Sequence, residues 1–379
     1  MDRKRRELMQ AGLLGGAVSA SGGLPLAFAA PPEPQAPRSN LTILMLGGTG
    51  FIGPHMVREA LRRGHSVSLF NRGRTNRDLF PDLELLVGDR DNGLQVLAGR
   101  NWDAVIDNSG YVPRHVRDSA RLLSSAVSHY LYTSTISVYA GFANPNDEDS
   151  PLATMPDETV EEVTGATYGP LKALCEKRAA EEIPADRLTI LRPTYVCGPG
   201  DRTDRFTYWP VRTMRGGDML WPGEPSHKIQ IIDVRDLANF VVDCVEKKIA
   251  GTYNTVTPAG SLTMGQLMED SAAVTASDMR PVWVDNEFVS RHQVAEGGAL
   301  PIWSPPDSDF ANVAFVNGER AAANGLVNRP VRETTRDTVA WWKTLPAERT
   351  ANLKAGLSAA REEELLELWK QESRQANIT

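Results

Sequence analysis

The stretch LTILMLGGTGFIGPHMVREALRRGH, residues 41–65, decides the fold of this chain. Its first six residues, LTILML, are a short continuous apolar run, which is typical of a buried parallel strand. The glycine-rich segment GGTGFIG follows at once, and beyond it Met56, Val57 and Ala60 recur at helical spacing. A strand, a glycine loop and a helix in this order are the opening unit of a dinucleotide-binding domain.

The glycines of this loop, Gly47, Gly50 and Gly53, have the spacing G-x-x-G-x-x-G. We expect the first to let the chain turn sharply off the strand, the second to let the backbone approach a pyrophosphate, and the third to let helix and strand pack closely. The free N–H groups at the start of the following helix favour the same anion. Phe51 and Ile52, which lie between the glycines, are predicted cofactor contacts too. Without its flanking strand and helix, the triplet would equally suit a structural turn.

Further apolar runs follow along the chain, and helical stretches separate most of them. The predicted strands are residues 66–70, 83–89, 103–107, 130–134 and 188–191. Strands that alternate with helices predict an α/β fold with a doubly wound parallel sheet. Beyond about residue 195 tryptophan, proline and glycine cluster, which predicts a smaller, interleaved substrate-binding region over the carboxyl edge of the sheet.

The first forty residues are interpreted as an export signal and a linker. Arg5 and Arg6 precede a weakly apolar, glycine-rich run that ends in Ala27-Phe28-Ala29, which is the order of a signal peptide, and the paired arginines resemble the twin-arginine type. We therefore predict recognition by the twin-arginine export machinery and a periplasmic or secreted location, or a membrane anchor if the signal stays uncleaved. A basic N-terminus that is no signal is the other interpretation. The predicted divisions are 1–30 signal peptide, 31–40 Pro-rich linker, 41–194 dinucleotide-binding domain, 195–345 substrate-binding region (part of which completes the sheet) and 346–379 C-terminal helical tail.

Composition limits the partners of the chain. The formal net charge is -7, which argues against nucleic acid as a partner because phosphate binding requires a basic face. The cysteines Cys175, Cys197 and Cys244 are few and odd in number, so they predict no disulfide framework and no metal site. This usage fits a protein that folds in the reducing cytoplasm and is exported afterwards.

The end of the second predicted strand chooses between the two nicotinamide dinucleotides. An acidic residue there binds the ribose 2′-hydroxyl of NAD, whereas arginine accommodates the 2′-phosphate of NADP. Asn71, Arg72 and Arg74 occupy this segment and no carboxylate does, so we predict NADP, with NAD and a merely solvated turn as the alternative. Asp89, after the third strand, suits the adenine end. The remaining predicted cofactor contacts are Arg90, Asn108, Ser109, Lys172 and Pro193.

Tyr168 and Lys172 form the Y-x-x-x-K pattern in this chain, at the start of a predicted helix. Residues four apart share one helix face, so the Lys172 ammonium is expected to stand near the Tyr168 phenol and lower its pKa. A phenol of this kind can take a proton from an alcohol while hydride leaves the same carbon. Thr135 ends the preceding strand and is predicted to orient the substrate, although alone it would equally satisfy backbone groups. Further candidate substrate contacts are Tyr111, Arg205 and Trp209.

Together these motifs resemble the short-chain dehydrogenase/reductase superfamily, and more narrowly its extended or atypical branch, the NAD-dependent epimerase/dehydratase-like proteins. GGTGFIG, YTSTISVYA, YGPLK, LRPTYVCGPGD and IIDVRDLANFVV occur in family order within residues 41–345. The resemblance implies a Rossmann-type domain with an interleaved substrate-binding region, and a Thr/Ser–Tyr–Lys catalytic set carried by Thr135, Tyr168 and Lys172. Family members often dimerise through a bundle that includes the Tyr–Lys helix, which makes a homodimer an expectation of the resemblance.

One departure from the family pattern bears on the reaction. Dehydratases and decarboxylases of this branch usually have an acidic residue just after the catalytic Thr or Ser. Ile136 and Ser137 follow Thr135 here, so we do not expect dehydration.

Two further departures bear on the substrate. Ile229 stands where many nucleotide-sugar epimerases have an arginine on the substrate diphosphate, with Lys228 or Arg205 as the substitutes. Residues 141–167 carry seven acidic side chains and no basic one, which predicts either a negative rim that repels nucleotide sugars or a solvated surface insertion.

The leading hypothesis is an exported NAD(P)-dependent oxidoreductase or epimerase that acts on a hydroxyl or keto group of a small molecule. Because a periplasm offers no recycled NADP pool, the cofactor must be tightly bound before export and regenerated in each turnover. The late tryptophans favour a carbohydrate substrate, with core packing as the alternative explanation. The alternatives for the whole chain are a non-catalytic NADP-binding sensor or scaffold and a nucleotide-sugar epimerase.

Overall fold

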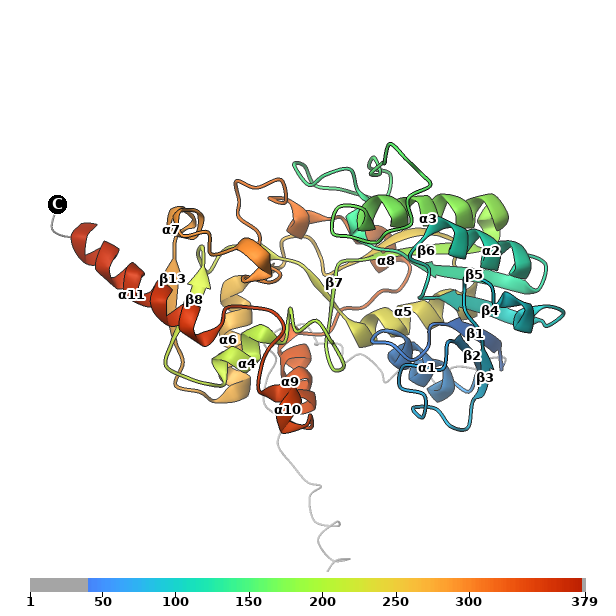
Figure 1. The fold of residues 1–379 in the computed structure, drawn as a ribbon, viewed down its shortest axis with the longest axis horizontal. Coiled ribbons are helices and arrows are strands. Elements are labelled where there is room, and N and C mark those ends of the chain that lie inside the picture. Colours follow the sequence, from blue (N-terminus) through green and yellow to red (C-terminus); the bar gives the residue numbers. More distant parts are fainter. Residues whose placement is uncertain (1–39, 377–379) are drawn as a thin grey trace, which may run out of the picture. The chain divides into compact units, whose positions relative to one another are not determined.

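The computed structural model describes residues 40–376, which belong to one compact unit. The predicted signal peptide and nearly all of the predicted linker lie outside the described residues. A seven-stranded sheet forms the centre, with the strand order β11-β6-β5-β4-β1-β2-β3 and parallel pairing throughout (Figure 1). The strands are β1 Thr42–Leu46, β2 Ser66–Asn71, β3 Glu84–Val87, β4 Trp102–Asp107, β5 Val127–Thr133, β6 Leu188–Pro193 and β11 Gly251–Thr255. The predicted doubly wound parallel sheet is confirmed.

Helices cover both faces of this sheet, and β1 shows why. Ile43 and Met45 pack toward α1 (Gly53–Arg62) and α5 (Val234–Lys247), whereas Leu44 and Leu46 pack on the opposite side. That side is covered by α2 (Pro113–Leu123) and α3 (Tyr168–Glu182). Successive side chains of a strand point to opposite faces, so a strand buried on both sides has to be apolar throughout.

The topology fixes where a ligand binds. The chain runs from β1 to β2 and β3 on one side, then crosses to β4 on the other side of β1. In sheets of this kind the crevice lies outside the carboxyl ends of the strands, at the point where the strand order reverses. We therefore look for the site in the loops after β1, β2, β3 and β4.

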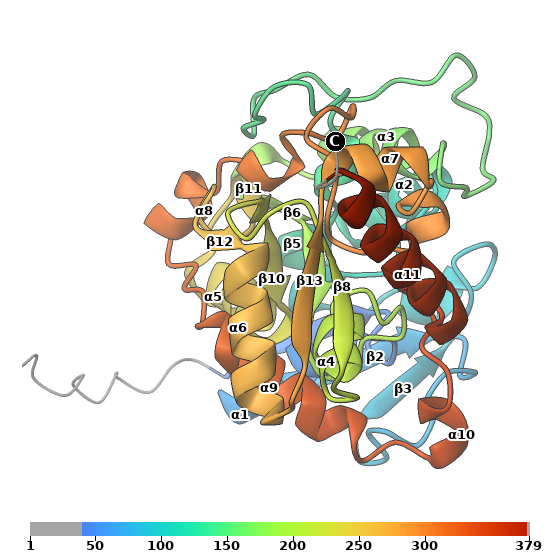
Figure 2. The same ribbon diagram turned by 90° about the vertical axis from the view of Figure 1, so that its left-hand side faces the viewer.

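A second region, with its own core, follows β6. It contains the strand pairs β7 (Tyr195–Cys197) with β10 (Ile231–Asp233), β8 (Asp218–Pro222) with β13 (Arg280–Val284), and β9 (Lys228–Ile229) with β12 (Leu262–Thr263). Figure 2 shows α6 (Met264–Thr275) and α11 (Ala359–Ala376) flanking the β8–β13 pair. The other helices are α4 Tyr208–Thr213, α7 Asn286–Arg291, α8 Glu319–Ala323, α9 Val331–Trp342 and α10 Ala347–Thr350. α5 and β11, from the same part of the sequence, belong to the central sheet.

The tryptophans of this second region are core residues. Trp209 and Trp221 are fully buried and stack with ring centroids 4.7 Å apart. Trp303 and Trp342 are buried as well, and the other late tryptophans are partly covered. The predicted aromatic surface for sugar stacking is therefore wrong for most of this set, because these rings fill the second core.

Two further features complete the fold. Cys175, Cys197 and Cys244 are all buried and free, so the prediction of no disulfide framework is confirmed. The tail helix α11 packs on the second region, where its buried Glu362 pairs with Arg212 at 2.5 Å. Among residues 40–376, no helix has both the length and the apolar character needed to cross a membrane.

Candidate functional site

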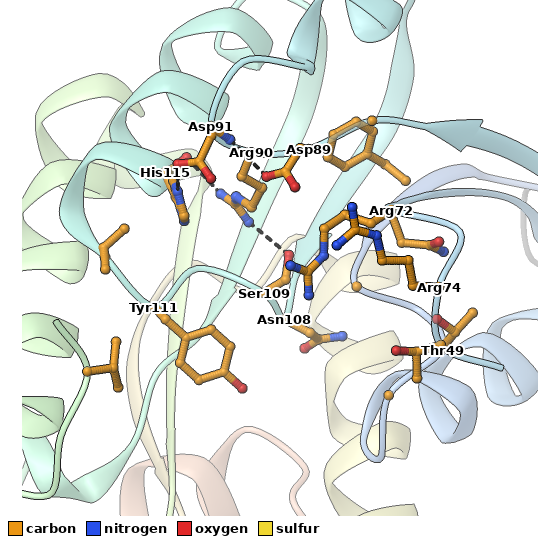
Figure 3. Close-up of a pocket in the computed structure, with 18 of the residues that line it drawn as sticks. Thr49, Arg72, Arg74, Asp89, Arg90, Asp91, Asn108, Ser109, Tyr111 and His115 are labelled. Atoms are coloured by element: carbon orange, nitrogen blue, oxygen red, sulfur yellow. Dashed lines mark hydrogen bonds and ion pairs between the residues drawn. The ribbon is translucent and has the colours of Figure 1, made fainter. Parts of the chain in front are cut away.

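A cleft of about 540 Å³ lies at the carboxyl ends of β1 to β4 (Figure 3). Its lining comes from the glycine loop after β1, residues 70–75 after β2, residues 88–91 after β3, residues 108–115 after β4, and the separate segment 161–163. This is the position that the reversal of strand order predicts.

The glycine loop is shaped by close contacts at two of its three glycines. Gly47 has a φ of +91°, and a Cβ there would lie 2.8 Å from the Ser109 Cβ. A Cβ on Gly53 would lie 2.4 Å from the Gly47 carbonyl oxygen, so only glycine lets α1 begin this close to the strand. Gly50 differs, because a Cβ there would meet no atom within 4 Å. The open side of Gly50 faces the cleft, which leaves room for a pyrophosphate beside the start of α1.

The end of β2 supplies positive charge without a carboxylate. Arg72 and Arg74 reach into the cleft (Figure 3), and neither has a hydrogen-bond or ion-pair partner among residues 40–376. The Asn71 Oδ1 accepts from the Gly73 N–H at 2.7 Å, while the buried Asn71 Nδ2 has no partner. Asp89 also lines the cleft, and its carboxylate accepts from the Asp91 N–H at 3.1 Å. Unpartnered arginines and an orphaned amide suit a bound 2′-phosphoryl ribose.

Arg90 lies on the floor of the same cleft but serves the protein itself. Both of its terminal nitrogens donate to Asp107, and Nη2 also donates to the Ser119 Oγ at 2.6 Å. Asp107 is fully buried and accepts from Tyr130 and from the Ser109 N–H. Arg90 lines the cleft, so its cofactor contact stays a prediction; its two terminal nitrogens are bound within the protein, and its buried Nε has no partner among the described residues.

Asp107, Ser119 and Tyr130 lie beneath the cleft, where they hold Arg90, and the sequence did not predict this role. Asp107 is the last residue of β4, and a carboxylate that follows the buried run Ala104–Ile106 was the available signal. Burial raises the pKa of a carboxyl group, but the Arg90 guanidinium more than offsets this and holds the pKa of Asp107 below its usual value.

Tyr168 and Thr135 come from different elements that glycine brings together. Tyr168 begins α3, and Thr135 caps the short 3-10 helix Ile136–Val138, where its Oγ1 accepts from the Ser137 N–H at 3.2 Å. A Cβ on Gly169 would lie 2.1 Å from the Ser137 carbonyl oxygen, so glycine is required for this approach. The Thr135 hydroxyl lies close enough to the Tyr168 phenol to lower the pKa of that phenol in part. The structure thus joins the two predicted catalytic groups.

Lys172 lies one turn further along α3, and its surroundings are neutral. Its Nζ donates to the Thr133 carbonyl at 2.7 Å and the Gly110 carbonyl at 2.9 Å, and lies 4.2 Å from the centroid of the Tyr132 ring. Burial lowers the pKa of Lys172 to about 8.

The predicted depression of the Tyr168 pKa is wrong for this structure. Burial raises the pKa of Tyr168, and the neighbouring Tyr111 raises it further, while the Thr135 hydroxyl and the charge of Arg205 only partly offset the increase. The reason is that the Lys172 ammonium points at two backbone carbonyls.

The candidate substrate contacts separate into two groups. Tyr111 is 49% exposed, lines the cleft, and its ring centroid lies 5.5 Å from the Lys172 Nζ. The Arg205 guanidinium carbon lies 5.0 Å from the centroid of the Tyr195 ring. Its charge is near enough to Tyr168 to lower the pKa of that phenol in part. Trp209 is instead fully buried, and its indole N–H donates to the Pro301 carbonyl at 3.0 Å. Trp209 therefore has no face for a ligand, and its predicted substrate contact is corrected.

The other predicted cofactor residues have mixed positions. Asn108 and Ser109 line the cleft, and the Asn108 Oδ1 accepts from Thr133 at 2.6 Å. Ile52 packs against the core, and Phe51 faces a second cavity on the far side of the loop. Pro193 is the last residue of β6 and pairs with Thr255.

The acidic segment 141–167 reaches the cleft, but arginines neutralise much of it. Glu161 and Val163 line the cleft, and Glu161 pairs with Arg114 at 2.9 Å. Other carboxylates of the segment pair with basic residues: Asp149 with Arg320, and Glu158 with Lys177 and Arg178. The predicted negative rim is therefore corrected to a set of ion pairs. Ile229, the other predicted departure, is buried in the second core.

Comparison with known proteins identifies the class. Residues 43–255 match the model of the NAD dependent epimerase/dehydratase family, and the chain belongs to this family. A 2-alkyl-3-oxoalkanoate reductase of Stenotrophomonas maltophilia is 28% identical over 230 residues, which are 53% of this chain and 64% of the reductase. The match therefore spans less than two thirds of that relative.

Solved structures agree on the fold. The Bordetella bronchiseptica enzyme WbmH in complex with NAD+ superposes with a TM-score of 0.60 at 17% identity, over 80% of this chain and 98% of WbmH. WbmG of the same organism, in complex with NAD and UDP, gives a TM-score of 0.59 at 15% identity, over 85% of this chain and all of WbmG (100%). At these identities the likeness concerns the Rossmann-like fold alone.

Proposed function

We propose that this protein is a nicotinamide-dependent oxidoreductase or epimerase that acts on a hydroxyl or keto group. The observation that carries the proposal is the position of Tyr168 at the start of α3, with Thr135 and the cleft residue Tyr111 near its phenol and Lys172 one turn along the same helix. Membership of an NAD-dependent family supports the same class of reaction.

NADP is the proposed cofactor. The Gly50 backbone and the N–H groups at the start of α1 would hold its pyrophosphate, and Arg72 and Arg74 would hold its 2′-phosphate. The support is the open space at Gly50 together with two cleft arginines that no described residue pairs. When bound, the nicotinamide supplies the hydride acceptor or donor.

Tyr168 is the proposed proton-transfer group. Because its pKa is raised, the phenol keeps its proton at neutral pH and is suited to donate that proton to a carbonyl oxygen as the carbonyl is reduced. In the reverse direction Tyr168 accepts the proton of the alcohol. The Thr135 Oγ1 orients the same oxygen, and the Lys172 ammonium keeps the end of β5 in place through the Thr133 carbonyl.

The proposed substrate is a small carbohydrate-like molecule without a nucleoside diphosphate. The buried Ile229, at the position that the family resemblance gives to a diphosphate-binding arginine, supports the absence of the diphosphate. Solved structures of the same fold hold UDP or UDP-glucose, which makes sugars the first substrates to screen; the tryptophans give no support, because most of them are core residues.

Tyr168→Phe tests the proton-transfer role. We expect the variant to bind NADP+ as the wild type does and to lose about 10²–10⁴-fold in turnover of a sugar or ketone substrate found by a panel screen. Tyr253→Phe is the matched control, because Tyr253 lies on β11 outside the cleft lining and its hydroxyl donates to the Ala250 carbonyl at 2.8 Å, so turnover should be unchanged. Full activity in Tyr168→Phe contradicts the proposal.

We further propose that NADP is tightly held, regenerated within each turnover and carried through export in the folded chain. Denaturing protein purified from the periplasmic fraction should release near-stoichiometric NADP(H), identified by chromatography. An empty site that requires added NADPH contradicts the closed redox cycle, and absence from the periplasm contradicts export.

A non-catalytic NADP-binding sensor is the second candidate, and the position of Lys172 favours it, because the ammonium is bound to the Thr133 and Gly110 carbonyls. Cofactor binding without turnover across the whole substrate panel would select this candidate. Turnover that Tyr168→Phe abolishes would exclude it.

A further inference from the structure

A second cavity, of about 500 Å³, lies on the other side of the glycine loop. Four parts of the chain form it: the glycine loop with the first turns of α1, Asn76 and Leu79 after β2, residues 199–202 after β7, and residues 341–354 at the end of α9 and around α10. Gly50 and Arg202 line both this cavity and the cofactor cleft. The two spaces therefore meet at the loop that we assign to the pyrophosphate.

Positive charge dominates the wall of this cavity. Arg58, Arg202 and the Lys354 side chain have no ion-pair partner within the described part of the chain, and Arg58 contacts only the Phe80 ring, at 5.6 Å. Arg349 donates from Nη2 to Asp204 at 2.5 Å. These three side chains are exposed, so water solvates their charges at little cost and they remain available to an anionic ligand.

Two buried groups on the wall lack hydrogen bonds. Asp201 is 1% exposed, and its Oδ1 accepts from the Thr203 N–H and Oγ1 while its Oδ2 has no partner. The Arg349 Nη1 is also buried without a partner. A buried donor or acceptor without a hydrogen bond costs free energy. A ligand that donates to the Asp201 Oδ2 and accepts from the Arg349 Nη1 would satisfy both groups.

Fixed contacts and apolar surface complete the site. The His55 Nε2 lies 2.8 Å from the Pro199 carbonyl, and the Asn76 Nδ2 donates to the Thr49 carbonyl at 3.0 Å. These bonds hold the loops on which Asp201 and Gly50 lie. Phe51 and Trp341 add aromatic surface to the lining.

We propose that this cavity binds a small hydroxylated polyanion, such as a sugar bisphosphate, while the dinucleotide occupies the adjacent cleft. Arg58, Arg202, Arg349 and Lys354 bind the anionic groups, and the Asp201 Oδ2 accepts from a hydroxyl group. Binding does not depend on the proposed catalytic activity, so it is measurable whether or not the protein turns over a substrate.

The test is calorimetric titration of the full chain at fixed ionic strength, which holds electrostatic screening constant. The probes are fructose 1,6-bisphosphate, inorganic pyrophosphate and citrate, each with and without saturating NADP+. We expect one saturable site that persists with NADP+ present. Competition with NADP+ would overturn the proposal, because the anion would then be in the cofactor's own phosphate site, and so would failure of all three probes to bind.

Charge-matched variants locate the site. Arg58→Gln and Lys354→Gln should each weaken fructose 1,6-bisphosphate binding about tenfold or more. Lys343→Gln, an exposed lysine in the segment between the lining residues Trp341 and Leu345, is the control and should bind as the wild type does. An equal loss in all three variants would mean non-specific attraction and would overturn the assignment.

Asp201→Asn tests the hydroxyl contact separately. Removing the carboxylate should tighten pyrophosphate binding and abolish the preference for the hydroxylated bisphosphate over pyrophosphate. An unchanged preference would overturn the role of Asp201.

Discussion

Arginines lie on both the floor and the rim of the cleft that we assign to the cofactor. The floor arginine is buried and paired, whereas the rim arginines are exposed and unpaired among the described residues. On the floor, Arg90 is 6% exposed and its guanidinium is bound by Asp107 and Ser119. On the rim, Arg72 and Arg74 are exposed and have no partner among the described residues. All three lie within one short stretch of the sequence, so the residue type alone does not assign their roles.

The difference teaches how charge is divided between stability and binding. A buried charge has to be paired inside the protein, because leaving it alone in a low-dielectric interior is costly. An exposed charge is solvated at little cost and remains available to a ligand. The floor should therefore matter for folding and the rim for cofactor choice.

Removing the charge of Asp107, the partner of Arg90, should have the largest effect on the free energy of unfolding. Asp107→Asn leaves the Arg90 charge buried without its partner, and we expect the free energy of unfolding in urea at pH 7 to fall by about 3–5 kcal/mol. Asp103→Asn, on the exposed side of the same strand, is the control and should cost about 1 kcal/mol. Equal losses in the two variants would contradict the distinction.

The floor also predicts the sign of a pH effect. Because the folded-state pKa of Asp107 is depressed, its stabilisation is present above the ordinary value of 3.8 and is lost as the pH falls through the lower folded-state pKa. The difference between wild type and Asp107→Asn should therefore be constant from pH 5 to 7 and shrink only below about pH 4. A difference that shrinks near neutral pH would point to another group.

Breaking the rim should change binding without changing stability. Arg72→Gln and Arg74→Gln are each expected to weaken NADP+ binding about 10- to 100-fold, with NAD+ binding unchanged and stability within about 0.5 kcal/mol. Arg77→Gln, exposed in the same segment but outside the lining, is the control. If both dinucleotides lost affinity equally, these arginines would bind the pyrophosphate and not the 2′-phosphate. If neither lost affinity, the arginines would belong to a solvated turn that does not contact the cofactor.

Lys172 combines features of both regions. It is buried, as Arg90 is, but its ammonium has no carboxylate partner and donates to two backbone carbonyls. Its pKa of about 8 means that between pH 8 and about 10.5 the unfolded chain holds a proton that the folded chain has lost. This lysine should therefore make stability rise with pH across that window, by at most about 1.4 kcal/mol per pH unit. Lys172→Met should remove the rise, and Lys177→Met, on the exposed face of the same helix, should keep it.

The smallest effect is expected at the ion pairs that tie segment 161–163 to the cleft. Arg114 bridges Asp91 at 2.8 Å and Glu161 at 2.9 Å, and all three side chains are partly exposed. Arg114→Ala should speed NADP+ release by about two- to fivefold at low salt, because exposed ion pairs contribute up to about 1 kcal/mol. Stopped-flow measurement should find no change for Arg117→Ala, which pairs with its neighbour Asp118. A difference that persists unscreened in 0.5 M salt would contradict an electrostatic tie.

Local sequence patterns were sufficient to predict most of the fold. The run Leu41–Leu46, the glycine loop and the alternation of strands and helices were sufficient for the parallel sheet, and the strand positions differ from prediction mainly at their ends. Tyr168 and Lys172 were found for the same reason, since a four-residue spacing on a helix is a local property. Gly169 is visible in the sequence as part of YGPLK, but nothing local says that it meets the Ser137 carbonyl.

What the sequence determined by itself is therefore short-range: the strand–glycine–helix unit, the sheet class, and the pair of residues on one turn of α3. Three features depend on the tertiary structure alone. Arg90 pairs with Asp107, and Trp209 is buried in the second core. Lys172 donates to backbone carbonyls and not to the Tyr168 phenol. The tertiary structure also brought Arg58, Asp201 and Lys354 around one cavity from distant parts of the chain. The physical reason is that burial and pairing depend on neighbours far away in sequence, and spacing along the chain carries no record of them.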